Sequence, residues 1–104
     1  MYDLIIVGAG PAGTGAGVYS ARKRMRTLVL AKEMHGQSFV SDKIYNWVGT
    51  IEISGRDLAK NCEEHLAYYE NIQDPVLSVK KGEEVMSIVQ RDGSFVLTTK
   101  KGAV

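Results

Sequence analysis

A glycine-rich turn near the start of the chain has the residue types and the spacing of a phosphate-binding loop. Gly8, Gly10 and Gly13 follow the pattern G-x-G-x-x-G, with Pro11 and Ala12 between the last two glycines. In a strand-turn-helix, the first glycine permits the tight turn, the second leaves room for a phosphate and the third lets the helix approach the strand. The free N–H groups at the start of such a helix attract an anion. The loop therefore predicts a site for the pyrophosphate of a dinucleotide.

An acidic side chain is expected about 20 residues beyond the glycines, where it would hydrogen-bond a ribose of the same nucleotide. Glu33 is the candidate, although the residue directly at the expected strand end is Ala31. The alternative is that Glu33 is a solvated loop residue. Lys32 and the basic run at 22–24 could favour a 2′-phosphate, and hence NADP, but they are also typical of solvated surface charge.

The residues around the loop predict the β-α-β unit that must position it. An uninterrupted aliphatic run at 4–7 predicts a strand buried on both faces, a helix is expected to begin at Pro11 and end near the basic run at 22–24, and a second buried strand is expected at 27–31. Gly17 lies inside the helix, where glycine costs about 1 kcal/mol relative to alanine. We expect a close contact between helix and sheet to explain it.

The middle of the chain predicts a long connection and a second helix. Residues 32–53 show no clear period, and a connection of that length is usually functional or mobile. The segment 54–57 resembles a capping box, and an amphipathic helix is expected to follow it and to end near Asn71. Its apolar stripe consists of Leu58, Cys62, Leu66 and Tyr69.

The last third of the chain predicts strands. A third parallel strand is expected at 76–79, and the runs 85–89 and 95–99 flank Asp92-Gly93, a strong hairpin signal. The order of elements predicts an α/β fold with a Rossmann-like parallel sheet and a β-hairpin (meander) insertion, in one domain spanning residues 1–104.

Composition excludes several classes of protein. A chain of 104 residues buries one modest core, less than a three-layer α/β domain normally needs, so an incomplete domain is expected. The net charge of +1 argues against nucleic acid or a membrane surface as the partner. The single cysteine, Cys62, excludes an internal dithiol pair and is expected to be a buried thiol. We expect no metal site, because His35 and His65 have no partner at ligand spacing.

The apolar run at 4–7 is too short to span a bilayer, and an acidic residue precedes it where a signal peptide would be basic. We therefore expect a cytoplasmic protein.

Seven short segments follow one another in a fixed order: YDLIIVGAGPAG at 2–13, YSARK at 19–23, TLVL at 27–30, EMHGQ at 33–37, NWVG at 46–49, ISGRDL at 53–58 and EEV at 83–85. In this order they resemble the low-molecular-weight thioredoxin reductases and the flavoprotein components of alkyl hydroperoxide reductases. The resemblance covers nearly the whole chain, and the ordered series is more specific than any one segment.

The resemblance implies that the chain binds FAD. In the family the glycine loop binds the pyrophosphate, and an acidic residue after the second strand holds the adenosine ribose. A Gly-Gln segment and an asparagine lie close to the flavin half, and one backbone position faces the adenine. Carried over by matching motifs, the cofactor-binding residues are Gly8, Gly10, Pro11, Ala12, Gly13, Glu33, Gly36, Gln37, Asn46 and Val85. No catalytic residue is assigned.

The sequence departs from the family pattern in three ways. His35 replaces the first glycine of the usual Gly-Gly-Gln, and Val48 replaces the usual proline. The family chain also continues into an NADPH domain, with or without a Cys-x-x-Cys pair, and into a closing Gly-Asp segment that contacts the flavin. We therefore expect the N-terminal part of an FAD-binding domain, or a decayed or split relative, without the full reductase reaction.

Three functions remain open. The first is the FAD-binding segment of an NAD(P)H-dependent oxidoreductase, in which the flavin relays a hydride from nicotinamide to an acceptor. NAD(P)H would be a co-substrate only where a second domain or a partner supplies its site. The second is a non-catalytic module that holds NAD, NADP or ADP at the same loop. The third is an interaction module that pairs through its sheet edge, as a homo-oligomer or with a complementing chain.

Overall fold

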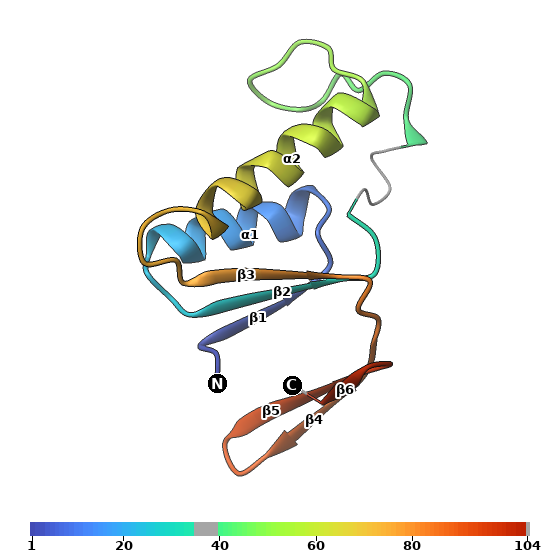
Figure 1. Cartoon of the computed structure of the whole chain (residues 1–104). Coiled ribbons are helices and arrows are strands. Elements are labelled where there is room, and N and C mark those ends of the chain that lie inside the picture. Colours follow the sequence, from blue (N-terminus) through green and yellow to red (C-terminus); the bar gives the residue numbers. More distant parts are fainter. Residues whose placement is uncertain (35–39, 104) are drawn as a thin grey trace.

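The computed structural model describes residues 1–34 and 40–103 and confirms the expected α/β fold (Figure 1). Two helices, α1 (Pro11–Arg22) and α2 (Gly55–Glu70), lie on one face of a parallel sheet, and a small antiparallel sheet lies on the other face. The strands of the parallel sheet are β1 (Leu4–Val7), β2 (Thr27–Ala31) and β3 (Leu77–Lys81). Those of the antiparallel sheet are β4 (Val85–Arg91), β5 (Ser94–Thr99) and β6 (Gly102–Ala103).

The parallel sheet has the order β1-β2-β3, with Leu4 opposite Thr27 and Thr27 opposite Leu77. All five residues of the central strand β2 are buried, as its uninterrupted aliphatic sequence predicts. The expectation that the run 4–7 is buried on both faces was wrong, since only Ile6 is buried, Leu4 and Ile5 are partly buried, and Val7 is 54% exposed. The reason is position, because β1 forms the edge of the sheet and the antiparallel layer covers Ile5 but leaves Val7 open.

Two apolar clusters hold the layers together. One, between the helices and the sheet, contains Ile6, Val29, Leu66 and Leu77. The other, between the two sheets, contains Leu28, Leu30 and Leu97, with Tyr2, Ile5 and Val85 packed against them. Successive residues of β2 thus serve opposite layers, as the alternation of side chains along a strand requires.

Helix α2 begins where the capping signal predicts. The Ser54 hydroxyl accepts a hydrogen bond from the Asp57 N–H at 3.1 Å, and Leu58, Cys62 and Leu66 are buried. Part of that buried face meets Gly17 of α1, where an added Cβ would lie 2.8 Å from Cδ2 of Leu66 and 3.6 Å from the side chain of Val29. The tightest contact of Gly17 is therefore with the neighbouring helix, and the expectation of a contact with the sheet was only partly right.

The hairpin between β4 and β5 turns at Asp92 and Gly93, whose φ angles of 49° and 79° belong to the left-handed region that this turn needs. Both strands are longer than the apolar runs that predicted them, as is β3, which includes Lys80 and Lys81 paired with Leu30 and Ala31. Main-chain pairing continues past the last apolar residue because the ladder does not depend on side-chain polarity. None of the helices described is both long and apolar enough to cross a bilayer.

Candidate nucleotide-binding site

The glycine turn joins β1 to α1 in a geometry that ordinary side chains would disturb. Gly8 has a φ of +104°, and its N–H donates a hydrogen bond to the carbonyl of Leu30 at 2.8 Å. A Cβ on Gly13 would collide with the backbone carbonyl of Gly8, so this glycine brings the helix close to the strand. A Cβ on Gly10, in contrast, would meet no described atom within 4 Å. The glycine turn therefore has no room for a side chain at Gly13, beside the Gly8 carbonyl, but has open space beside Gly10.

The start of α1 is open as well. Gly10 is its N-cap residue and supplies no side-chain cap, and Pro11 has no N–H to donate. Ala12 is exposed, while Thr14 already uses its N–H in a bond to the carbonyl of Gly10 at 2.9 Å. Free backbone N–H groups at a helix start favour an anion, which is the chemistry that the glycine spacing indicates.

A pocket of about 390 Å³ lies beside the turn, at the carboxyl ends of β1 and β2. Besides Val7 and Leu30 in these strands, three segments line it: the turn at 8–10, Lys32 and Glu33 after β2, and residues 83–85, where β4 begins. Ligands of open parallel sheets bind at such strand ends. The structure thus brings Gly8, Gly10, Glu33 and Val85, which are distant in sequence, to one pocket.

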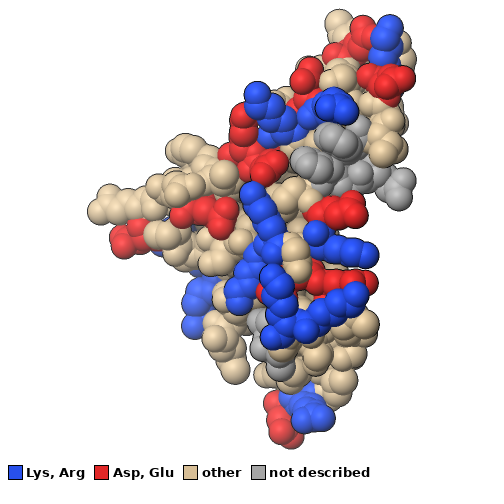
Figure 2. All heavy atoms as spheres, turned by 45° about the vertical axis from the view of Figure 1, so that its right-hand side comes forward, with Lys and Arg blue, Asp and Glu red and all other residues tan. Residues whose placement is uncertain are grey.

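The lysines beside this pocket are paired. Glu84 lies 2.9 Å from the ammonium of Lys100 and 3.9 Å from that of Lys32. The hydrogen bond from Lys100, and then the charges of both lysines, hold the pKa of Glu84 below its ordinary value. Figure 2, turned toward this side of the molecule, shows Lys and Arg side chains interleaved with Asp and Glu. Because Lys32 faces a carboxylate, it favours a 2′-phosphate less than its sequence position suggested.

Glu83 differs from its neighbour. It also lines the pocket, but its Oε2 is buried and has no hydrogen-bond partner among the described residues. Its backbone N–H donates to the carbonyl of Ala31 at 3.1 Å, which fixes it against the end of β2. The sequence assigned no role to Glu83, because the burial of one carboxylate oxygen depends on how the end of β2 and the β3–β4 connection meet.

Of the three residues expected near the flavin half of FAD, the structure describes only Asn46. Asn46 is exposed on the connection before α2 and does not line the described wall of the pocket. Gly36 and Gln37 lie outside the described residues. Within the same connection, a bridge between Ile44 and Ile53 provides local structure.

A larger cavity of about 620 Å³ lies in the groove between α1 and α2. Its walls include Tyr19, Trp47, His65 and Tyr69, and the Tyr69 hydroxyl accepts a hydrogen bond from Arg22 at 3.4 Å. Cys62 also lines it, and burial raises the pKa of this thiol. Volume alone does not show which of the two cavities is suited to bind a nucleotide. The open glycine turn and the strand ends meet at the smaller one, which is the better nucleotide site.

Within the part of the chain described, no three His, Cys, Asp or Glu residues are grouped so that they could hold a metal ion.

Comparison with known proteins shows which family this chain belongs to. The family model "Pyridine nucleotide-disulphide oxidoreductase" matches residues 2–103. An alkyl hydroperoxide reductase protein of Staphylococcus epidermidis is 32% identical over 103 residues, which is 99% of this chain and 19% of that protein. Thioredoxin reductase of Treponema pallidum is 39% identical over 105 residues, 98% of this chain and 32% of that protein.

Solved structures agree. Thioredoxin reductase of T. acidophilum superposes with a TM-score of 0.85 at 33% identity, covering 98% of this chain and 32% of that one. That of Lactococcus lactis gives a TM-score of 0.88 at 28% identity, covering 100% of this chain and 32% of that one. The chain thus spans about a third or less of the length of these relatives. The resemblance to thioredoxin reductases and alkyl hydroperoxide reductase flavoproteins is confirmed, and the chain belongs to the pyridine nucleotide-disulphide oxidoreductase family.

Proposed function

We propose that residues 1–104 form the first segment of an FAD-binding domain and bind the adenosine diphosphate half of FAD in the pocket at the strand ends. The observation that carries the proposal is the open backbone above Gly10, beside a pocket of about 390 Å³. Pockets for small molecules commonly measure about 300–1,000 Å³. The pyrophosphate would lie over Gly10 at the start of α1, where the helix dipole and the free N–H groups favour negative charge.

The roles of the other predicted site residues follow from this placement of the pyrophosphate. Glu33, at the rim of the pocket after β2, would accept hydrogen bonds from the hydroxyls of the adenosine ribose. The backbone of Val85, at the start of β4, would face the adenine. The family resemblance assigns Gly36, Gln37 and Asn46 to the flavin half of the cofactor.

In the complete enzyme, FAD would supply the relay of a hydride from NAD(P)H to an acceptor. The residues described would contribute position and electrostatics. They hold the pyrophosphate on backbone dipoles and anchor the ribose, so the flavin end of the cofactor projects from a fixed point.

The exposed outer edge of β1 favours a second use of the same fold. An edge strand presents unpaired N–H and C=O groups, which a complementing chain or a second copy could pair. Such an interaction module would form a dimer or hetero-complex, and nucleotides would leave its melting temperature unchanged.

The first experiment measures binding of FAD, ADP and NADP to the purified chain by calorimetry and by melting temperature. We expect FAD and ADP to stabilise the protein, by about 2.7 kcal/mol at a ligand concentration 100 times the Kd. Stabilisation by NADP alone would contradict the proposal, as would a melting temperature that none of the three ligands changes.

Gly10→Val supplies the sharper test. Gly10 has a φ of −73° and a ψ of −170°, an extended conformation that valine readily adopts, and the added side chain starts in open space. The variant should therefore fold normally while its side chain occupies the place of the phosphate. We expect loss of ADP and FAD binding, with Gly15→Ala on α1 as the control that retains it. Binding by Gly10→Val at the wild-type affinity would refute the assignment of the loop.

A further inference from the structure

The groove between α1 and α2 is a second cavity, separate from the pocket at the strand ends (Figure 1). Its volume of about 620 Å³ lies within the range of small-molecule pockets, about 300–1,000 Å³. None of the described residues that line the groove also lines the pocket at the strand ends. A ligand in the groove would therefore leave the proposed nucleotide pocket free.

Aromatic side chains form the walls of this groove. Trp47 and Tyr19 line it and are 40% and 73% exposed, although tryptophan in particular is normally well buried. Tyr69 is held in place, because its ring stacks on that of His65 at 5.8 Å and meets the ring of Tyr68 edge-on at 5.0 Å. Such rings pack favourably against another planar ring. The walls thus favour an aromatic ligand over an aliphatic one of similar size.

A positive charge lies beside the same groove. Arg22, the last residue of α1, lines it at the end of the helix away from the glycine turn. Its guanidinium donates to the Tyr69 hydroxyl at 3.4 Å, and among the described residues it takes part in no ion pair. A guanidinium has five N–H donors, so this one bond leaves donors for a carboxylate. The charge of Arg22 therefore favours an anionic group on the ligand.

Gly15 keeps the groove open along α1. It lines the groove, and a Cβ at this position would meet no described atom within 4 Å. Gly17 of the same helix differs, because its Cβ would collide with Leu66. Glycine is unfavourable inside a helix, and no close contact accounts for it at Gly15. A larger side chain at Gly15 would instead take up space that a ligand could use.

We propose that this groove binds a small aromatic carboxylate, with its ring against Tyr19, Trp47 and Tyr69 and its carboxylate on the guanidinium of Arg22. The planar fork of a guanidinium donates to both oxygens of a carboxylate, which makes this pairing stronger than a neutral hydrogen bond. The ring and the charge of the ligand are thus recognised by different side chains, and each contribution can be removed separately.

The test uses 3-phenylpropionate as the probe, on the whole chain. Its amide, 3-phenylpropionamide, lacks the charge, and 3-cyclohexylpropionate lacks the aromatic ring. Calorimetry gives the dissociation constants, and the fluorescence of Trp47, the only tryptophan of the chain, reports binding in the groove. We expect 3-phenylpropionate to bind about threefold or more tighter than either analogue.

Arg22→Gln tests the charge, because glutamine keeps hydrogen-bond donors but is neutral. It should bring the acid and its amide within about twofold of each other, and the preference for the aromatic over the cyclohexyl acid should remain. Lys23→Gln is the matched control. It removes the neighbouring positive charge, which does not line the groove, and should keep both preferences.

Gly15→Leu tests the location, because leucine is a good helix former and its side chain starts in open space. We expect it to abolish binding of all three probes. Melting curves show whether each variant is folded. Should Gly15→Leu fail to fold, Trp47→Ala, in the connection before α2, replaces it, with calorimetry as the readout. This variant should reduce the preference for the aromatic acid over the cyclohexyl acid.

Four outcomes overturn the inference. The wild-type chain binds no probe, or binds the acid no tighter than one of the two analogues. Arg22→Gln keeps the wild-type preference for the acid over its amide. A folded Gly15→Leu variant binds 3-phenylpropionate at the wild-type affinity, which would place the acid at another site. Trp47→Ala keeps the full preference for the aromatic acid. None of these results bears on ADP binding at the strand ends, so the proposed function is tested separately.

Discussion

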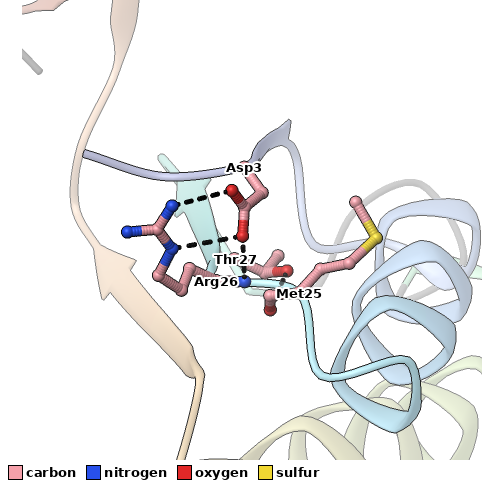
Figure 3. Close-up of polar contacts among 4 residues, drawn as sticks. All are labelled: Asp3, Met25, Arg26 and Thr27. Carbon is pink, nitrogen blue, oxygen red and sulfur yellow. Dashed lines mark hydrogen bonds and ion pairs between the residues drawn. The ribbon is translucent and has the colours of Figure 1, made fainter.

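The carboxylate of Asp3 accepts three hydrogen bonds from Arg26, which join the residue before β1 to the residue before β2 (Figure 3). Oδ2 of Asp3 accepts from the backbone N–H of Arg26 at 2.9 Å and from its Nε at 3.2 Å, and Oδ1 accepts from Nη2 at 2.9 Å. The carbonyl of Arg26 accepts in turn from the N–H of Asp3 at 2.8 Å. The contact fixes the amino ends of two paired strands, opposite the ends that form the pocket.

This contact predicts a dependence of stability on pH. The hydrogen bonds from Arg26 hold the pKa of the Asp3 carboxyl below its ordinary value. Because the pKa is lower in the folded than in the unfolded chain, where it is about 3.9, the carboxylate stabilises the folded state above that unfolded pKa. The contribution is lost as the pH falls through the lowered pKa. We expect Asp3→Asn to reduce the melting temperature at pH 7 by a small amount, since the pair is partly exposed.

Melting curves of wild type and Asp3→Asn from pH 7 downward measure this effect. The two melting temperatures should converge only as the pH falls through the lowered pKa of Asp3 in the folded chain, because both side chains are neutral below it. Asp42→Asn, in the exposed connection before α2, is the control for loss of one negative charge. A difference between wild type and Asp3→Asn that stays constant down to the lowest pH would show that the carboxylate charge does not matter.

The contact between α1 and α2 predicts opposite effects for two glycines of one helix. A Cβ on Gly17 would lie 2.8 Å from the Leu66 side chain, which is only 1% exposed and has little room to move. We expect Gly17→Ala to destabilise the protein by about 1–2 kcal/mol despite the better helix propensity of alanine. Gly15→Ala meets no described atom within 4 Å and should stabilise by about 0.5–1 kcal/mol. Urea unfolding measures both, and stabilisation by Gly17→Ala would disprove tight packing at that position.

The burial of the Cys62 thiol predicts that it reacts slowly in the native protein. Burial raises its pKa, an effect that a hydrogen bond with Thr14 reduces but does not reverse. The thiolate is the reactive form, so we expect iodoacetamide at pH 8 to modify the native chain about tenfold or more slowly than the urea-unfolded chain. Mass spectrometry of quenched samples follows the reaction. Equal rates in the two states would mean that the groove between the helices leaves the thiol accessible.

The features that could be predicted from sequence depend on a few consecutive residues. The positive φ of Gly8, the hairpin turn at Asp92 and Gly93, and the Ser54 cap each follow from residue types within one short segment. The three parallel strands could also be found, since aliphatic runs mark buried strands.

The features that could not be predicted from sequence depend on contacts between segments that are far apart in the chain. The apolar stripe of α2 does not reveal that Leu66 lies against Gly17, because a stripe shows only which side is buried. Likewise, Lys32 and Glu33 look equally solvated in the sequence, and the pairing of Lys32 with Glu84 appears only in the folded structure. The exposure of Val7 was missed because an aliphatic run does not distinguish a central strand from one at the edge.

The order of the strands also has a consequence for folding kinetics. The unit β1-α1-β2 closes over a short stretch of chain, whereas β3 pairs with β2 across a much longer one that includes α2. Near that pairing Arg24 donates to the carbonyl of Asp74, 50 residues away, at 2.8 Å. Contacts between distant residues form more slowly, because loop closure costs entropy before the contact stabilises anything. We therefore expect the glycine turn to form before residues 83–85 reach it. In a refolding experiment, capture of a nucleotide would report this late step.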